Sequence, residues 1–91
     1  HMHVLGSGYE LKVEDTDTCV VRGDRYDFDN QLMYQLLEPV DFKQGQTLSF
    51  TCRWDNSESN PDQINETVQD VVAGEYTNQE MCFAFALVVK E

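Results

Sequence analysis

The chain has 91 residues, of which 17 are acidic and 6 basic, and its formal net charge is -11. This length suits one small domain or a segment of a larger protein. The negative charge argues against nucleic acid and against an anionic membrane surface as partners, because both would repel the chain. The longest apolar run, residues 81–89, is far shorter than the roughly 20 residues needed to span a bilayer.

Alternating apolar and polar residues predict a series of short strands. The clearest covers residues 47–54, and its apolar face consists of Leu48, Phe50, Cys52 and Trp54. The final apolar run, residues 81–89, is expected to be a strand buried on both faces. Further strands are expected at residues 1–5, 9–13, 18–22 and 31–37, with a short strand or irregular segment around residues 68–72.

Turn-forming residues separate these strands. We expect a turn or bulge at residues 6–8 and polar turns or loops at residues 14–17, 27–30, 43–46 and 55–62. About seven short strands with turns about every 8–12 residues predict an all-β fold, an antiparallel β-sandwich of the jelly-roll type. We expect residues 1–91 to form a single domain that is only part of the complete sandwich.

A pair of histidines opens the chain. His1 and His3 are spaced so that both side chains lie on one face of an extended segment, which makes half of a metal site. A plausible further donor is Met81, whose soft thioether favours Cu(I) over calcium or magnesium. In the alternative interpretation, the histidines are a terminus or tag remnant without a role and Met81 is a core residue. Because the pair lies at the edge of the chain, we expect this site to be its least ordered part.

The chain contains three cysteines, an odd number. A bond between Cys52 and Cys82 would close a loop of about 30 residues and stabilise the fold by about 3.6 kcal/mol in the chain-entropy model. Cys19 would then be a buried apolar thiol, or would pair with a cysteine outside these 91 residues. A disulfide would indicate an oxidising compartment, so we expect a secreted or periplasmic protein.

Several short motifs together resemble one known family. The chain opens with His-Met-His-Val-Leu-Gly at residues 1–6, and Thr77 precedes Asn-Gln-Glu-Met-Cys at residues 78–82. The intervening matches are Tyr34, Glu38, Pro39, Gly45, Leu48, Thr51, Cys52, Asp55, Asn56, Ser57, Asn60, Pro61, Gly74 and Glu75. These motifs resemble the C-terminal domain of the copper type II, ascorbate-dependent monooxygenases, the relatives of peptidylglycine alpha-hydroxylating monooxygenase and dopamine beta-hydroxylase. The loop at residues 55–61 is more similar to the bacterial members.

The resemblance implies a set of site residues. His1, His3 and Met81 correspond to the copper ligands of the family, which are also its catalytic centre, and Cys52 and Cys82 correspond to the disulfide of the domain. In this family the copper at this site activates dioxygen for the hydroxylation of an unactivated C–H bond, with ascorbate as the reductant. Copper is therefore the expected cofactor and a small molecule the expected substrate.

Three departures from the family pattern shape these expectations. The chain has no third histidine, so the copper site that delivers electrons must lie in an N-terminal domain outside it. Strands that precede the two histidines in the family are also not included, so we expect an exposed sheet edge and a possible homodimer through that edge. Phe83 and Phe85 stand where peptide-amidating members have Asn and Tyr, which argues against a peptide carboxylate and suggests an apolar substrate pocket, with core packing as the alternative.

Two hypotheses for function follow. In the first, the chain is the dioxygen-activating copper domain of a monooxygenase and is inactive alone. In the second, it is a non-catalytic copper-binding or interaction module that retains the fold.

Overall fold

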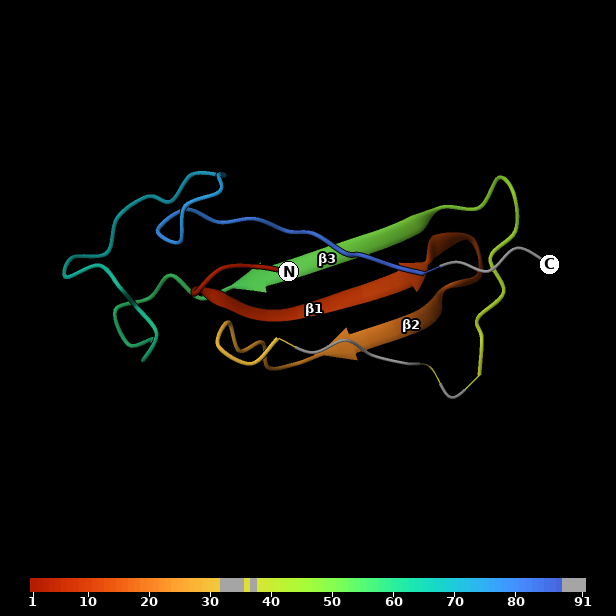
Figure 1. The fold of residues 1–91 in the computed structure, drawn as a ribbon, viewed down its shortest axis with the longest axis horizontal. Coiled ribbons are helices and arrows are strands. Elements are labelled where there is room, and N and C mark those ends of the chain that lie inside the picture. The colour runs from red at the N-terminus through yellow and green to blue at the C-terminus, as the bar shows by residue number, and fades with distance from the viewer. Residues whose placement is uncertain (32–35, 37, 88–91) are drawn as a thin grey trace.

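A three-stranded antiparallel sheet forms the centre of the computed structural model, which describes residues 1–31, 36 and 38–87 (Figure 1). The strands are β1 (Gly6–Val13), β2 (Thr18–Gly23) and β3 (Leu48–Trp54), in the spatial order β2-β1-β3. The described residues contain no α-helix, and a single 3-10 turn, η1 (Glu14–Thr16), joins β1 to β2. The all-β prediction is therefore confirmed, but the described residues form one sheet of three strands, where a sandwich of about seven strands was expected.

The β1–β2 hairpin has a local cause in its connection. Asp17 closes η1 in the left-handed conformation with a φ of 50°, a region in which Asp is one of the better tolerated side chains. Its backbone N–H donates to the carbonyl of Glu14 at 3.1 Å, and Lys12 makes an ion pair with its carboxylate at 3.3 Å. The chain therefore reverses direction in the polar loop that was predicted at residues 14–17.

The predicted irregularity at residues 6–8 is a β-bulge. Gly6 is paired with Trp54 and Gly8 with Arg53, so Ser7 is the extra residue on β1. The freed carbonyl of Ser7 accepts a hydrogen bond from the backbone N–H of Tyr26 at 3.0 Å. The bulge therefore fixes the segment that follows β2 against the beginning of β1.

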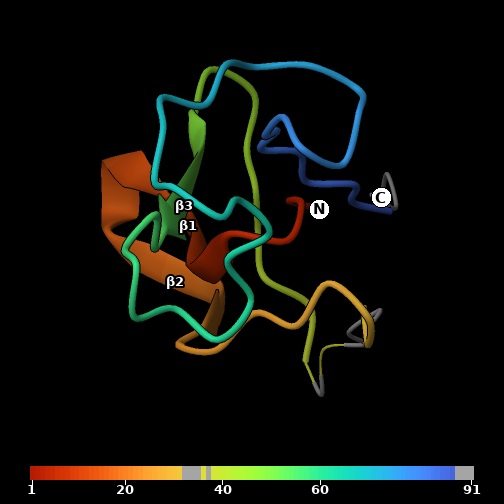
Figure 2. The ribbon, with the colours of Figure 1, turned by 90° about the vertical axis from the view of Figure 1, so that its left-hand side faces the viewer.

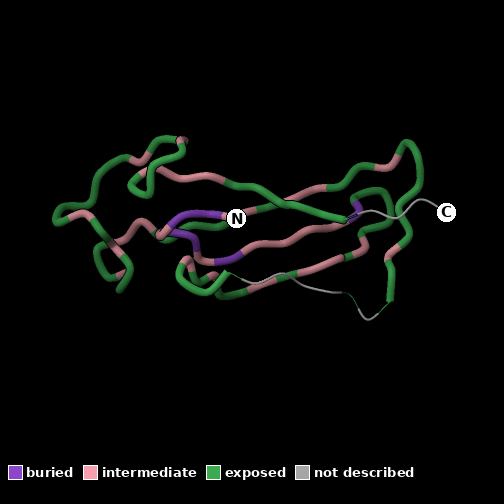
Figure 3. Tube along the Cα trace, in the orientation of Figure 1, coloured by how far each residue is buried: buried purple, intermediate pink, exposed green. Residues whose placement is uncertain are grey.

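The most buried part of the molecule is its beginning (Figure 3). Met2 is 0% exposed, His3 4% and Leu5 2%, and Val13 at the other end of β1 is also fully buried. The expectation that the histidine pair would be the least ordered edge of the chain is therefore wrong. Residues 1–5 are not the predicted strand: residues 1–3 have no regular structure, and a turn follows over residues 3–6, where the Gly6 N–H donates to the His3 carbonyl at 3.0 Å.

Tyr26 and Gly6 hold this turn in place. The Tyr26 hydroxyl donates to the Met2 carbonyl at 2.6 Å and accepts from the Met2 N–H at 3.1 Å, so both buried backbone groups of Met2 are satisfied. A Cβ at Gly6 would lie 2.7 Å from the Tyr26 ring and 2.9 Å from Met2, so only glycine fits this close approach.

The segment at residues 81–87 differs most from its prediction. Figure 2 shows it with the N-terminal segment on one side of the sheet, but it is not a strand as far as it is described. Phe85 is 86% exposed and Leu87 97%, so burial on both faces is wrong for residues 81–87. A strand needs a neighbour along its whole length, and within the described residues the backbone of residues 81–87 pairs with another segment at Phe83 and His1 alone. Residues 88–91 lie outside the described residues.

The remaining connections are mostly as predicted. Turns occur within residues 27–30, 43–46 and 55–62. Residues 68–72 are irregular, and the next residue, Ala73, forms an isolated bridge with Glu80. The predicted strand at residues 31–37 falls largely outside the described residues. No helix in the described part of the chain is long and apolar enough to cross a membrane.

Cys52 and Cys82 form the disulfide that the family resemblance implied, joining β3 to the segment beside the N-terminus. Cys19 on β2 is a free thiol and is exposed, so its expected burial is wrong. Disulfides are typical of proteins from oxidising compartments.

The two kinds of cysteine predict different chemical behaviour. Under native conditions without reductant, iodoacetamide should label the chain once, at Cys19, whereas reduction and unfolding should expose three reactive thiols. Replacing both Cys52 and Cys82 with Ala should lower the free energy of unfolding by about 3.6 kcal/mol, because the unfolded chain loses its cross-link. Mass spectrometry and urea denaturation measure these outcomes, with Cys19→Ala as the control. Two labels on the native chain would contradict the assignment.

The Tyr26 contacts predict an alkaline sensitivity. Burial, assisted by the negative charges of Glu80 and Asp27, raises the pKa of the Tyr26 phenol above 10.0, although its bond to Met2 partly opposes this. The neutral phenol is thus favoured by folding, and its contribution to stability is complete below about pH 10 and is lost as pH rises further. Tyr26→Phe should cost about 1–3 kcal/mol at pH 8, because it leaves the Met2 backbone groups unpaired.

Urea denaturation from pH 8 to 11 measures this effect. The difference in stability between the unchanged chain and Tyr26→Phe should narrow as the pH rises. A constant difference across this range would show that the phenol does not titrate in the way described.

Candidate metal centre

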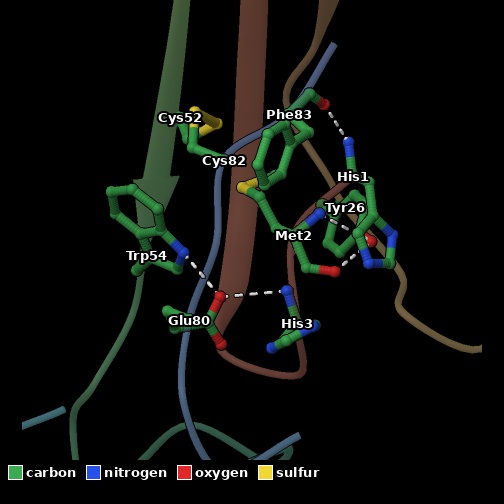
Figure 4. The surroundings of a disulfide bond; sticks show 9 residues. All are labelled: His1, Met2, His3, Tyr26, Cys52, Trp54, Glu80, Cys82 and Phe83. Atoms are coloured by element: carbon green, nitrogen blue, oxygen red, sulfur yellow. Dashed lines mark hydrogen bonds between the residues drawn. A yellow bond between two sulfur atoms is a disulfide. The ribbon is translucent and has the colours of Figure 1, made fainter. Parts of the chain in front are cut away.

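The site begins where the two ends of the chain meet. His1 and Phe83 exchange backbone hydrogen bonds: the Phe83 N–H donates to the His1 carbonyl at 2.9 Å, and the His1 backbone nitrogen donates to the Phe83 carbonyl (Figure 4). Two residues further along the first segment, the His3 ring contacts the backbone of Gln79. Residues 79–83 therefore run antiparallel to residues 1–3, and the predicted proximity of the histidines to the segment that carries Met81 is found.

Both imidazoles are oriented through the same ring nitrogen. His1 Nδ1 lies 2.6 Å from the side-chain oxygen of Gln31, and His3 Nδ1 lies 2.9 Å from the carbonyl oxygen of Gln79. A carbonyl oxygen can only accept, so in each neutral ring Nδ1 carries the proton. Each Nε2 then keeps its lone pair, which is the arrangement in which histidine binds a metal while its other nitrogen is held by an outer partner.

The two rings lie close to one another and to one aromatic side chain. Their centroids are 5.4 Å apart, and the Phe28 ring lies 6.3 Å from His1 and 5.8 Å from His3. Two imidazoles that bind one ion through nitrogens at about 2 Å have ring centres roughly 5–6 Å apart, so this separation suits a shared ion. Phe28 therefore packs beside both rings.

Met81 lies on the same segment, half-buried, between the two residues that hold the histidines. It is two residues after Gln79 and two residues before Phe83. Its side chain lines an open depression of about 480 Å³ together with Ala73, Gly74, Glu75, Glu80, Cys82 and Phe83. The disulfide at Cys82 and the pairing at Phe83 fix the backbone directly after Met81.

The two phenylalanines considered for a substrate pocket have different surroundings. Phe83 is 49% exposed and lines the depression beside Met81, whereas Phe85 is 86% exposed and does not line it. The two rings stack on one another with centroids 6.3 Å apart. Core packing, the alternative for both residues, is wrong.

The Glu80 carboxylate connects the segment at residues 79–83 to the turn at residues 3–6 and to the end of β3. Its Oε1 accepts from the His3 N–H at 2.9 Å and from Trp54 Nε1 at 2.7 Å (Figure 4). Its Oε2 accepts from the Leu5 N–H at 3.1 Å. Because these donors already occupy both carboxylate oxygens, Glu80 is poorly placed to act as a metal ligand itself.

Several of these functional contacts were missed in the sequence. Glu80 belongs to the Glu-Met-Cys motif, but nothing in the motif revealed its bonds to His3 and Leu5. Phe28 was recognised only as an aromatic residue in a turn. The acceptor role of Gln31 had no signal at all, since its partner is 30 residues away.

Other kinds of metal site are not found in the described residues, which bring together no group of three or more His, Cys, Asp or Glu side chains able to hold a metal. A site of two histidines and a methionine lies outside that class of site. The remaining candidate is therefore the one built on His1 and His3.

Comparison with known proteins agrees with this geometry. A family model described as copper type II ascorbate-dependent monooxygenase, C-terminal domain, matches residues 1–88. The chain belongs to this family. No curated protein and no solved structure matches the chain. The copper monooxygenase family is copper- and ascorbate-dependent. Two imidazoles held through Nδ1 and a methionine on the adjacent segment are donor types that suit copper, particularly Cu(I).

The ring orientations give a test that needs no metal. In the metal-free protein at neutral pH, ¹⁵N NMR of the histidine rings should show the proton on Nδ1 in both residues. Gln31→Leu removes the acceptor of His1 alone, so the His1 ring should shift towards a mixture of tautomers while His3 stays unchanged. A proton on Nε2 of either ring in the unchanged chain would contradict the assigned hydrogen bonds.

Proposed function

We propose that the chain is the dioxygen-activating copper domain of a monooxygenase, with one copper ion held by His1, His3 and Met81. The observation that carries the proposal is that both imidazoles are fixed through Nδ1, which leaves the lone pair on Nε2, beside the segment that carries a thioether. Residues 1–91 would form a single C-terminal domain of the larger enzyme.

The residues of the chain would divide the work of the site. Copper supplies redox chemistry with dioxygen for the hydroxylation of a substrate C–H bond. His1 and His3 bind the ion through neutral nitrogens, and Met81 adds a soft donor that stabilises the reduced metal. Phe28 shields the rings, while Phe83 forms an apolar wall beside Met81 against which a substrate can be placed.

The lining of the depression indicates the kind of substrate. It contains two glutamates and no Lys, Arg or His side chain. A substrate carboxylate would therefore find no cation there and would be repelled by Glu75, which supports a small apolar molecule over a glycine-extended peptide. Phe85 would contribute only if it moved towards this surface.

The proposed partners follow from what these residues do not provide. The sequence has only two histidines, so a second copper site, fed by ascorbate, would be supplied by an N-terminal domain of the same protein. In the described part of the chain, no further strand is hydrogen-bonded to the outer edges of β2 or β3, which supports a homodimer through a sheet edge. The disulfide supports a secreted or periplasmic location.

The ligand set predicts how copper binding responds to mutation. Met81→Ile should weaken Cu(I) binding by at least the roughly 10- to 100-fold that loss of an outer-shell partner costs, and should abolish the copper–sulfur signal in X-ray absorption. His3→Ala should weaken binding at least as much. Competition with a chromophoric Cu(I) chelator measures the affinity, and Leu87→Ile, a change at an exposed site on the same segment, is the control.

Unchanged affinity and an unchanged sulfur signal in Met81→Ile would disprove the proposed ligand set. The non-catalytic alternative is separated by a second assay. The copper-loaded chain with ascorbate and dioxygen should give no hydroxylated product until the N-terminal copper domain is added. Absence of product with both domains present would favour the binding or interaction module.

A further inference from the structure

The carboxylate of Glu80 joins three separate parts of the molecule. Two of its donors are backbone N–H groups from the turn at residues 3–6, and the third is the Trp54 indole at the end of β3. The Glu80 backbone is itself held from a further segment, because its N–H donates to the Val72 carbonyl at 3.0 Å and its carbonyl accepts from the Gly74 N–H at 3.1 Å. Glu80 is therefore fixed on both its backbone and its side chain.

The place of these contacts links Glu80 to both halves of the metal centre. His3 donates its backbone N–H to the Glu80 carboxylate, and its ring donates to the carbonyl of the preceding residue, Gln79. Met81 follows Glu80 directly in the chain. Loss of the bonds from the His3 and Leu5 N–H groups to the Glu80 carboxylate would thus move His3 relative to Met81.

We infer that Glu80 is a positioning residue, whose carboxylate sets the distance and orientation of His3 relative to Met81. This inference rests on the proposed copper function. It assigns no ligand or proton-transfer role to Glu80, because both of its oxygens accept N–H donors from the chain. Its effect is to build the metal geometry into the metal-free protein.

The three hydrogen bonds to the Glu80 side chain require a carboxylate. An ionised carboxylate only accepts, so both of its oxygens can face N–H groups, and such charge-assisted bonds are stronger than neutral ones. A glutamine has one accepting oxygen and one donating NH₂ group. In Glu80→Gln, an NH₂ group would therefore face either the Leu5 N–H or the two donors at the other oxygen, and at least one contact would be lost.

The competing explanation is that Glu80 only stabilises the fold and has no influence on the metal. In that case its loss would lower the stability of the fold but leave the copper coordination of the folded fraction unchanged. A positioning residue changes the ligand distances, so its loss alters the spectroscopic signature of the bound metal. The two explanations can therefore be distinguished in the folded protein.

The first experiment uses the unchanged chain without metal. Hydrogen exchange measured by NMR should show the His3 and Leu5 amides protected to a degree similar to the paired amides of β1 and β3. In Glu80→Gln, exchange at His3 and Leu5 should accelerate while the sheet amides stay protected. Free-chain exchange at His3 and Leu5 in the unchanged protein would overturn the inference, whatever the folding of any variant.

The second experiment loads the proteins with Cu(I). Glu80→Gln should bind Cu(I) about 10- to 100-fold more weakly, and its copper–sulfur signal in X-ray absorption should be weakened or lost while both imidazole nitrogens remain bound. Trp54→Phe is the matched control, since it removes one donor to Glu80 but leaves the carboxylate on His3 and Leu5. Its affinity and sulfur signal should be close to those of the unchanged chain.

The ligand variants Met81→Ile and His3→Ala distinguish failure of the positioning role from failure of the copper function. If Met81→Ile and His3→Ala lose copper but Glu80→Gln keeps normal affinity and sulfur signal, the positioning role is wrong and the proposed copper function stands. If Met81→Ile and His3→Ala bind copper normally, the copper function itself fails. Glu80→Asp retains the charge on a shorter side chain, so it should recover part of the affinity that Glu80→Gln loses.

Discussion

The structure depends on satisfying a buried stretch of backbone that has no regular strand or helix of its own. Residues 1–5 are the most buried segment of the described chain, yet they consist of an irregular stretch and a turn. Their N–H and carbonyl groups need partners, because an unpaired buried backbone group costs as much as a lost hydrogen bond. Tyr26 supplies partners from one distant part of the sequence, and Glu80 and the backbone of Phe83 supply them from another. The same contacts that make the fold possible also bring the histidines to the segment that carries Met81.

Local patterns were sufficient for the parts of the fold that are governed by nearest neighbours. Alternation located β1 and β3, β-branched residues located β2, and the glycines at residues 6–8 located the bulge. The continuous apolar run was misleading for residues 81–87, because such a run forms a strand only where another strand or layer accepts its hydrogen bonds and side chains. Whether such a neighbouring strand or layer is present depends on the tertiary fold and cannot be read from the residues of the run.

The candidate site was predictable to a different extent. The motifs gave the ligand candidates His1, His3 and Met81, since residue type and family pattern carry that information. Short-range sequence could not give the groups that orient them, because Gln31 and Glu80 lie 30 and 77 residues from the histidines they contact. Contacts between such distant residues form only when the tertiary fold brings their segments together.

The two imidazoles are held in the same tautomer by chemically different groups. His3 donates to a main-chain carbonyl, which every residue type at position 79 would provide. His1 donates to the side chain of Gln31, which a single substitution can remove. Sequence drift can therefore change the basicity and tautomer of one nitrogen donor while the other stays constant. With copper at the proposed site, a substitution at position 31 would change the reduction potential of the metal without altering any of the residues proposed to bind it.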